Sequence, residues 1–182
     1  AEARVLRMIG DAETRYREDP VRMLRAARFA AKLDFTLHPD TEAPLHRLAY
    51  MLDSVPPARL FDETAKLFLA GSALASFDVL TSLGLLPHLM PDVAKAVAEA
   101  PDAPPAKLLR LGLENTDQRV RADKSVTPTF LFAVLLWPAI LRAAGAPLGP
   151  LPDDPQLLGT ACDEVLGRQL RRITIPKRFG LP

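Results

Sequence analysis

The sequence predicts an all-α protein, and three observations support this fold class. Apolar residues recur at the three- and four-residue spacing of amphipathic helices. Most of the 18 prolines fall between these apolar segments, where a proline ends one helix or begins the next. Strand-like alternation of β-branched residues is nearly absent from the chain.

The first predicted helix covers residues 20–33. Asp19 is a good N-cap for it, and Pro20 suits the first helical position. The second predicted helix is opened by Asp40 or Thr41. The full set of predicted helices is 20–33, 41–53, 57–70, 72–83, 92–100, 106–116, 127–144 and 155–172.

The breaks between the helices follow from proline and glycine. Gly71 is expected to stop the helix at 57–70 as a C′ residue. Residues 100–105, with three prolines, predict a linker, and the segment 145–155 predicts a loop. Pro138 is expected to kink the penultimate helix.

Length and composition limit the classes of protein to which the chain can belong. The chain has 182 residues, enough for one domain or one and a half, and it is 48% hydrophobic and 25% charged, which excludes intrinsic disorder throughout. Its longest strongly apolar stretch, 130–141, is shorter than the roughly 20 residues of a membrane span. A single cysteine, Cys162, excludes a disulfide framework. We therefore expect no membrane association and a cytoplasmic protein.

The formal net charge of +1 hides an uneven distribution, because two segments, 15–32 and 165–182, are strongly basic. Such patches point weakly to a polyanion such as nucleic acid, and solvated helix faces are the plainer alternative. The candidate RNA-binding residues in the two segments are Arg15, Arg17, Lys32, Arg171, Arg172, Lys177 and Arg178.

One arginine has an unusual position on the first predicted helix. At about 100° per residue, Arg22 falls between Phe29 and Leu33, inside an apolar arc, with Asp19 beside it. A charge on an apolar face needs a partner, because desolvating it alone is costly. Arg22 and Asp19 can pair with one another at i,i+3 spacing. Alternatively the two side chains line a cleft and offer acceptors and fork-shaped donors to a flat polar ligand, such as a nucleobase edge.

Residues 18–29 resemble the Glu-Asp-x-x-Arg-x-x-Arg-Ala-x-Arg-Phe signature of the class II nucleotidyltransferases, the bacterial poly(A) polymerases and tRNA CCA-adding enzymes. Further similarity lies in residues 7–11, 56–61, 128–133 and 175–178. The resemblance is dense to about residue 90 and is greater to poly(A) polymerases than to CCA-adding enzymes.

The resemblance implies roles for several residues. Asp19 and Arg22 correspond to the family residues that read the incoming base. Arg25 and Arg28 are expected to approach phosphates, and Glu18 is a supporting residue. Arg59 and Glu63 match a family pair in the neck; they also suit an ordinary i,i+4 helix bridge, and we give both a supporting role.

The residues that bind catalytic metal ions in this family are not found in the chain. No Asp-x-Asp motif occurs, and Asp11-x-Glu13 lies in a polar stretch rather than on an apolar strand. The three histidines and Cys162 show no metal-ligand spacing. We therefore expect no catalytic residue and no cofactor site here, with Mg²⁺ and ATP used by the full enzyme. The chain is interpreted as a piece without the catalytic head, inactive alone.

The sequence as a whole predicts a helical neck at residues 1–71 and part of a helical body at 72–182. Its expected function is to select ATP and to hold the 3′ end of RNA within a template-independent RNA 3′-adenylyltransferase, a poly(A) polymerase. Two alternatives remain: part of a tRNA CCA-adding enzyme, or a non-catalytic helical interaction module.

Overall fold

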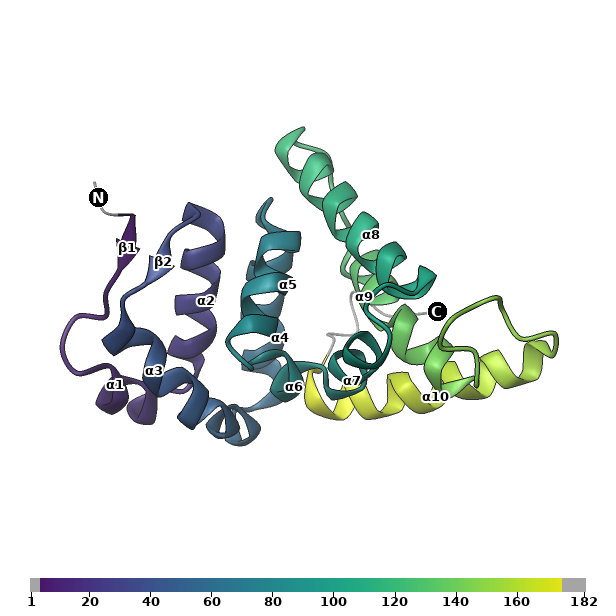
Figure 1. Ribbon diagram of the computed structural model, residues 1–182, viewed down its shortest axis with the longest axis horizontal. Helices are drawn as coiled ribbons and strands as arrows, with labels where there is room; N and C mark the ends of the chain where they lie inside the picture. The colour runs from purple at the N-terminus through teal and green to yellow at the C-terminus, as the bar shows by residue number, and fades with distance from the viewer. Residues whose placement is uncertain (1–3, 175–182) are drawn as a thin grey trace.

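The computed structural model describes residues 4–174, and these residues form an all-α fold (Figure 1). The only strands in this part of the chain are two-residue segments, β1 (Val5–Leu6) and β2 (Thr36–Leu37), which pair in parallel. The helices are α1 Ala12–Glu18, α2 Val21–Leu33, α3 Pro39–Leu48, α4 Pro57–Phe68, α5 Ala73–Ser82, α6 Leu86–Leu89, α7 Pro91–Glu99, α8 Pro104–Arg121, α9 Pro128–Ala143 and α10 Pro155–Arg172, with a 3₁₀ helix, η1, at Ala49–Ser54.

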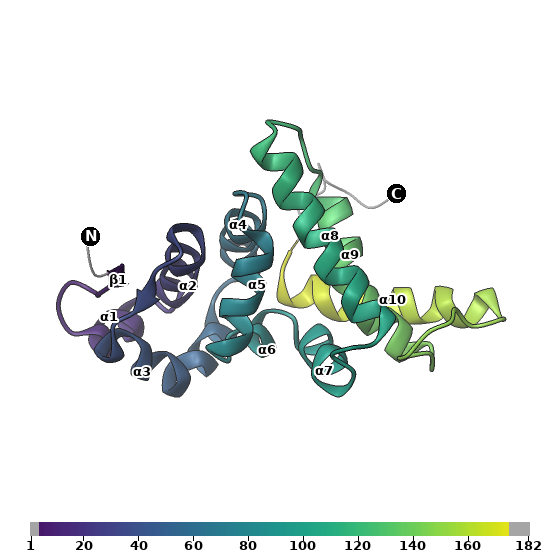
Figure 2. The same ribbon diagram turned by 45° about the horizontal axis from the view of Figure 1, so that its top comes forward.

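The helices form an elongated array, and α10 runs back so that its end lies beside α6. Figure 1 shows β1, β2 and α1–α3 at one end, α4 and α5 in the middle, and α7–α10 at the other end. Helix α2 packs against α4 and α5, and α9 packs against α7, α8 and α10. In the turned view of Figure 2, α8 again projects away from α10. No described helix combines the length and the apolar composition that a membrane span requires.

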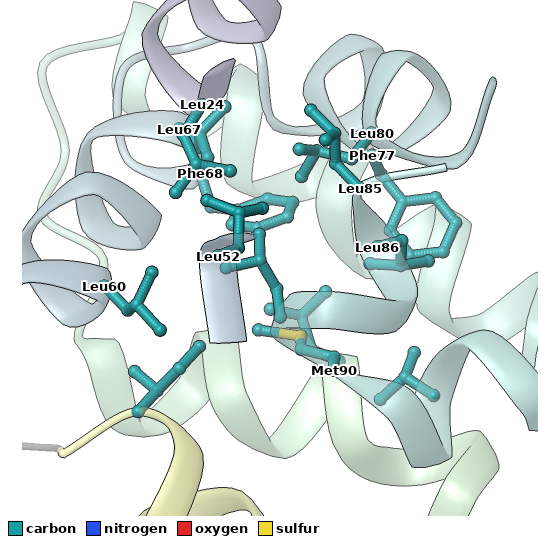
Figure 3. Packing of buried hydrophobic residues seen from close by; sticks show 14 of the residues in the cluster. Leu24, Leu52, Leu60, Leu67, Phe68, Phe77, Leu80, Leu85, Leu86 and Met90 are labelled. Atoms are coloured by element: carbon teal, nitrogen blue, oxygen red, sulfur yellow. The ribbon is translucent and has the colours of Figure 1, made fainter. Parts of the chain in front are cut away.

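A continuous apolar core joins the two ends of the array. It extends from Ala12 in α1 to Ile173 after α10. Figure 3 shows its middle, where Leu24 of α2 approaches Leu67 and Phe68 of α4. Each fully buried leucine or phenylalanine contributes about 1.5–3 kcal/mol relative to an exposed one, so this core holds the predicted neck against the predicted body.

Most predicted helices are confirmed. Helix α10 has the predicted bounds, and α2, α4, α5, α7 and α9 agree within two residues at each end. Gly71 has a positive φ of +80°, but it is not the predicted C′ residue, because α4 ends at Phe68 with Leu69 as its C-cap and Gly71 follows two residues later. Helix α9 continues through Pro138.

Three sequence predictions are corrected. Helix α1 was not predicted, although Asp11 caps it by accepting a 2.8 Å hydrogen bond from the Thr14 N–H. Helix α3 begins earlier than expected, because Nδ1 of His38 accepts from the Asp40 N–H and Pro39 takes the first helical position; it then gives way to η1. The predicted linker at 100–105 is shorter, since α8 starts at Pro104 and reaches Arg121.

Candidate nucleotide-reading site

The turn between α1 and α2 places Asp19 and Arg22. Asp19 ends α1 in an extended conformation, with φ of −147°, and Pro20 directs the chain into α2. The helix begins at Val21, one residue later than predicted, and Pro20 occupies the N-cap position. Asp19 nevertheless supports the helix start, because its Oδ1 accepts a 3.3 Å hydrogen bond from the Val21 N–H.

Asp19 pairs with an arginine from another helix. Nη2 of Arg59, in α4, lies 3.1 Å from Oδ1 and 3.2 Å from Oδ2 of Asp19. Of the alternatives left open by the sequence, the Asp19–Arg22 pair and the i,i+4 bridge between Arg59 and Glu63 are not the ones formed: Asp19 pairs with Arg59, and Glu63 pairs with Lys66.

Arg22 is held by the helix that precedes it. Its Nη1 donates to Oε2 of Glu18 at 2.9 Å and to the Arg15 carbonyl at 3.3 Å. Arg15 also binds Glu18, at 3.2 Å. Hydrogen bonds from Arg15 and Arg22 lower the pKa of the Glu18 carboxyl, so Glu18 is ionised at neutral pH and fixes the position of Arg22.

A groove of about 230 Å³ lies beside Arg22. Its residues come from α2 and from the segments around β1 and β2: Leu6, Arg7, Met8, Arg22, Arg25, Ala26, Phe29, Leu37 and Thr41. Phe29 is 44% exposed, and Leu33 likewise, so the arc that contains Arg22 does not face the core. The core side of α2 is the opposite one, with Met23, Leu24 and Ala27.

Glu63 of α4 is the carboxylate around which the basic side of α2 is organised. It is only 3% exposed, yet three cations approach it. Nζ of Lys66 lies 3.0 Å from Oε1, Nε of Arg25 lies 3.4 Å from the same oxygen, and Nε of Arg28 lies 3.9 Å from Oε2. Lys32, further along α2, is exposed and has no ion pair within the described residues.

This arrangement leaves positive charge in excess, because one buried carboxylate faces three cations. Nε of Arg28 and Oε2 of Glu63 are buried without a hydrogen bond, so they attract one another only through space. The Arg28 guanidinium also lies 4.7 Å from the centre of the Phe29 ring. Sequence reasoning did not pair Glu63 with α2, although its place between Leu60 and Leu67 on the buried face of α4 was a signal.

The other basic residues of α1 are paired on the surface. Arg17 binds Glu13 at 2.7 Å, and Arg47 of α3 binds the same carboxylate at 2.7 Å. Both hydrogen bonds, Arg17 first, lower the pKa of Glu13. The Arg47–Glu13 pair joins α1 to α3 and so supports the turn that carries Asp19.

Arg172, in the C-terminal basic segment, is bound into the fold. Nε of Arg172 donates to the His88 carbonyl at 2.5 Å, and its Nη2 lies 3.1 Å from Oδ1 of Asp53. Burial lowers the pKa of the Arg172 guanidinium, an effect that the Asp53 charge opposes. Arg171 is exposed, whereas Lys177 and Arg178 lie outside the described residues.

A metal site is not formed by residues 4–174, since no group of three or more His, Cys, Asp or Glu side chains is placed to hold an ion there. Magnesium therefore has no fitting donor set in this part of the chain, and no chemical step can be derived through it. What the site offers is an acceptor at Asp19, a donor fork at Arg22 and a positive surface at Arg25 and Arg28.

The chain is similar in sequence to several known proteins. Residues 34–97 match a protein-family model described as "Probable RNA and SrmB- binding site of polymerase A". Poly(A) polymerase I of Escherichia coli O6:H1 is 42% identical over 96% of this chain, and that of Haemophilus influenzae is 44% identical over 72%. A CCA-adding enzyme of Lactobacillus johnsonii is 36% identical over 46% of the chain.

These similarities relate the chain to the class II nucleotidyltransferases. Within that family it is a homologue of part of bacterial poly(A) polymerase I. The chain spans 38% of the length of the E. coli relative and 29% of the H. influenzae relative.

Proposed function

We propose that this chain is the neck and part of the helical body of a template-independent RNA 3′-adenylyltransferase, a poly(A) polymerase. The observation that carries the proposal is the extent of the similarity. The match to poly(A) polymerase I extends over 96% of the chain, whereas the matches to CCA enzymes cover between 44% and 52% of it. We propose residues 1–71 as the neck and residues 72–182 as the partial body.

The proposed role of Asp19 and Arg22 is to read the adenine edge. The Asp19 carboxylate is an acceptor for the exocyclic amino group, and Arg22 is a donor for a ring nitrogen. Arg59 and Glu18 orient the two side chains through the ion pairs at 3.1 and 2.9 Å. Asp19 keeps acceptor capacity beside Arg59, because a carboxylate has about four lone-pair sites.

Arg25 and Arg28 are proposed to contact phosphates of ATP or of the RNA, with Glu63 supporting both. The support for this role is their position on the charge excess around Glu63. Magnesium ions would stabilise the charge that develops on the transferred phosphoryl group. Since the described residues hold no fitting metal site, the 182-residue chain should not extend an RNA primer by itself.

For RNA holding, we propose basic residues of the two basic segments, excluding Arg172 and the arginines assigned to nucleotide contact. The contacts of Arg172 with His88 and Asp53 favour a structural role for that residue instead. The proposed RNA-contacting residues are Arg15, Arg17, Lys32, Arg171, Lys177 and Arg178.

Nucleotide competition in the complete enzyme tests the proposed reading role. Arg22→Ala should reduce the preference for ATP over CTP by about 5- to 150-fold, since one well-formed base contact is worth roughly 1–3 kcal/mol. Arg28→Ala is the matched variant, and it should weaken substrate binding with little change in base choice. Thermal melts of both proteins check that each remains folded.

Unchanged selectivity in Arg22→Ala together with a large drop in melting temperature would mean that Arg22 only stabilises the α1–α2 turn. The products separate the two enzyme classes: long adenosine tails support a poly(A) polymerase, whereas addition that stops after two cytidines and one adenosine shows a CCA-adding enzyme.

A further inference from the structure

A second hollow, whose lining includes an arginine, an aromatic ring and polar side chains, lies where α8 ends and α9 begins. Its volume is about 330 Å³. Its lining residues are Asn115, Arg119, Ser125, Val126, Thr127 and Phe130. We propose that this hollow binds one nucleotide of single-stranded RNA, with the base stacked on Phe130 and the phosphate at Arg119. The inference rests on the proposed RNA-holding function and adds a site outside residues 34–97, the segment that matches the RNA-binding family model.

Phe130 provides an exposed aromatic surface on an otherwise apolar helix. Its side chain is 42% exposed, while the next two residues, Leu131 and Phe132, are buried in the core. The backbone of Phe130 is fixed at the start of α9, because the Thr127 hydroxyl accepts a 3.2 Å hydrogen bond from the Phe130 N–H and caps the helix. An exposed aromatic ring is a surface on which unpaired bases of any identity can stack.

Arg119 supplies an oriented positive charge in the same hollow. Its Nη2 donates to the Ser125 carbonyl at 3.1 Å, which holds the guanidinium in place. A carbonyl orients a cation without neutralising it. Within the described residues Arg119 has no carboxylate partner, so its other N–H groups remain for a phosphate.

The surroundings of the hollow add to the positive charge. Residues 119–124 contain Arg119, Arg121 and Lys124 and a single carboxylate, Asp123. Arg121 is oriented in the same way as Arg119, since its Nε donates to the Gly71 carbonyl at 3.1 Å. Lys124 lines a neighbouring hollow on the other side of the loop. The end of α8 therefore attracts a polyanion that continues beyond one nucleotide.

An exposed aromatic ring beside a positive charge favours the binding of single-stranded RNA over duplex RNA. A base can stack on Phe130 only when it is not already paired and stacked inside a helix. The chain should therefore bind oligo(A) more tightly than double-stranded RNA of the same length. The Phe130 ring and the Arg119 charge should both contribute to this binding. Substitutions at the two residues therefore test the site independently.

Fluorescence anisotropy of the 182-residue chain with labelled oligo(A), over a salt series, tests the site. Phe130→Ala should weaken binding by roughly fivefold or more with an unchanged salt slope, and Phe130→Trp should keep the affinity. Arg119→Gln should weaken binding and reduce the salt slope by about 1. The matched controls are on α8: Leu111→Ala, an exposed apolar residue, and Lys107→Ala, an exposed cation, should leave affinity nearly unchanged.

The outcomes distinguish this site from the proposed function. If the unsubstituted chain does not bind oligo(A), RNA holding fails and the site fails with it. If it binds, but Phe130→Ala and Leu111→Ala have the same affinity, the hollow is not a nucleotide site and RNA holding stands. Duplex RNA that binds as tightly as oligo(A), with no effect of Phe130→Ala, also overturns the proposal.

Discussion

The two basic segments of the chain look alike in sequence and differ in their surroundings. Around α2, the cations Arg25, Arg28 and Lys66 share one buried carboxylate, Glu63. On α10, two of the three arginines have separate carboxylate partners. Arg168 binds Asp92 at 2.7 Å, and Arg172 binds Asp53 at 3.1 Å.

The difference shows that charge density in a sequence does not reveal what the charge does. An arginine with its own carboxylate and a buried stem joins two parts of the fold, as Arg172 joins α10 to η1 and α6. Cations that outnumber their carboxylates produce a positive surface that remains able to attract phosphate. The α2 side is therefore the better candidate for substrate contact, and three predictions test this comparison.

The largest effect is expected at Glu63. Glu63→Ala removes the carboxylate that compensates Arg25, Arg28 and Lys66, and it leaves the partly buried Arg28 without its counter-charge. Because removing one member of a buried pair leaves an uncompensated charge, the free energy of unfolding should fall by about 3 kcal/mol. Urea unfolding monitored by circular dichroism measures this change.

Asp62, the preceding residue in α4, provides the matched control. It is exposed, so Asp62→Ala removes the same charge from the same helix and should change stability by no more than about 0.5 kcal/mol. Equal effects of the two substitutions would show that Glu63 does not organise the cations of α2.

The next effect, at Arg172, tests the structural side of the comparison. Arg172 is 18% exposed and bonded to His88 and Asp53, so Arg172→Ala should lower the free energy of unfolding by about 2 kcal/mol. Arg171→Ala, one residue earlier and exposed, should have almost no effect on stability. Denaturant titrations of both variants measure this difference. A loss of RNA affinity in Arg172→Ala without any loss of stability would reverse the assignment.

Much of the fold was predictable, because the helix signals in this chain are local. Helix α10 starts at Pro155, and the Asp154 carboxylate caps it by binding the Gln156 N–H, as residues of these types usually do. Helix α1 escaped prediction because its seven residues are fewer than the window over which apolar periodicity can be recognised. The parallel pairing of β1 with β2 depends on contacts between distant segments, so nothing local indicates it.

The contacts of Asp19 and Arg22 could not be predicted from the sequence. Helical geometry and the signature both pointed to Asp19 and Arg22. Their actual partners, Arg59 and Glu18, depend on the turn at Pro20, which separates α1 from α2 and which a continuous helical wheel does not contain. A helical wheel shows which residues share a side of the helix, but not what covers that side. For this reason the wheel could not show that the apolar arc around Arg22 faces away from the core.

The smallest effect is a change in the pKa of Glu18, and it tests how Arg22 is held. Hydrogen bonds from Arg15 and Arg22 place that pKa below the ordinary glutamate value of 4.5. Arg15→Ala and Arg22→Ala should each raise the pKa part of the way, because each removes one of the two hydrogen bonds that lower it. Carbon-detected NMR titration of the side-chain carboxyl measures both shifts.

The sign of the pH effect follows from the lowered pKa. A carboxyl that is more acidic in the folded state stabilises the fold above its unfolded pKa, and this contribution is lost as the pH falls through the folded value. Since Glu18 is exposed, the pKa is the sensitive measurement, and the melting temperature is not. Glu99, whose pKa is lowered by Arg142 at the other end of the molecule, should titrate identically in every variant. If Glu18 also titrates identically in Arg22→Ala, then Glu18 does not hold Arg22, and the proposed orientation of the donor fork toward a base loses its physical support.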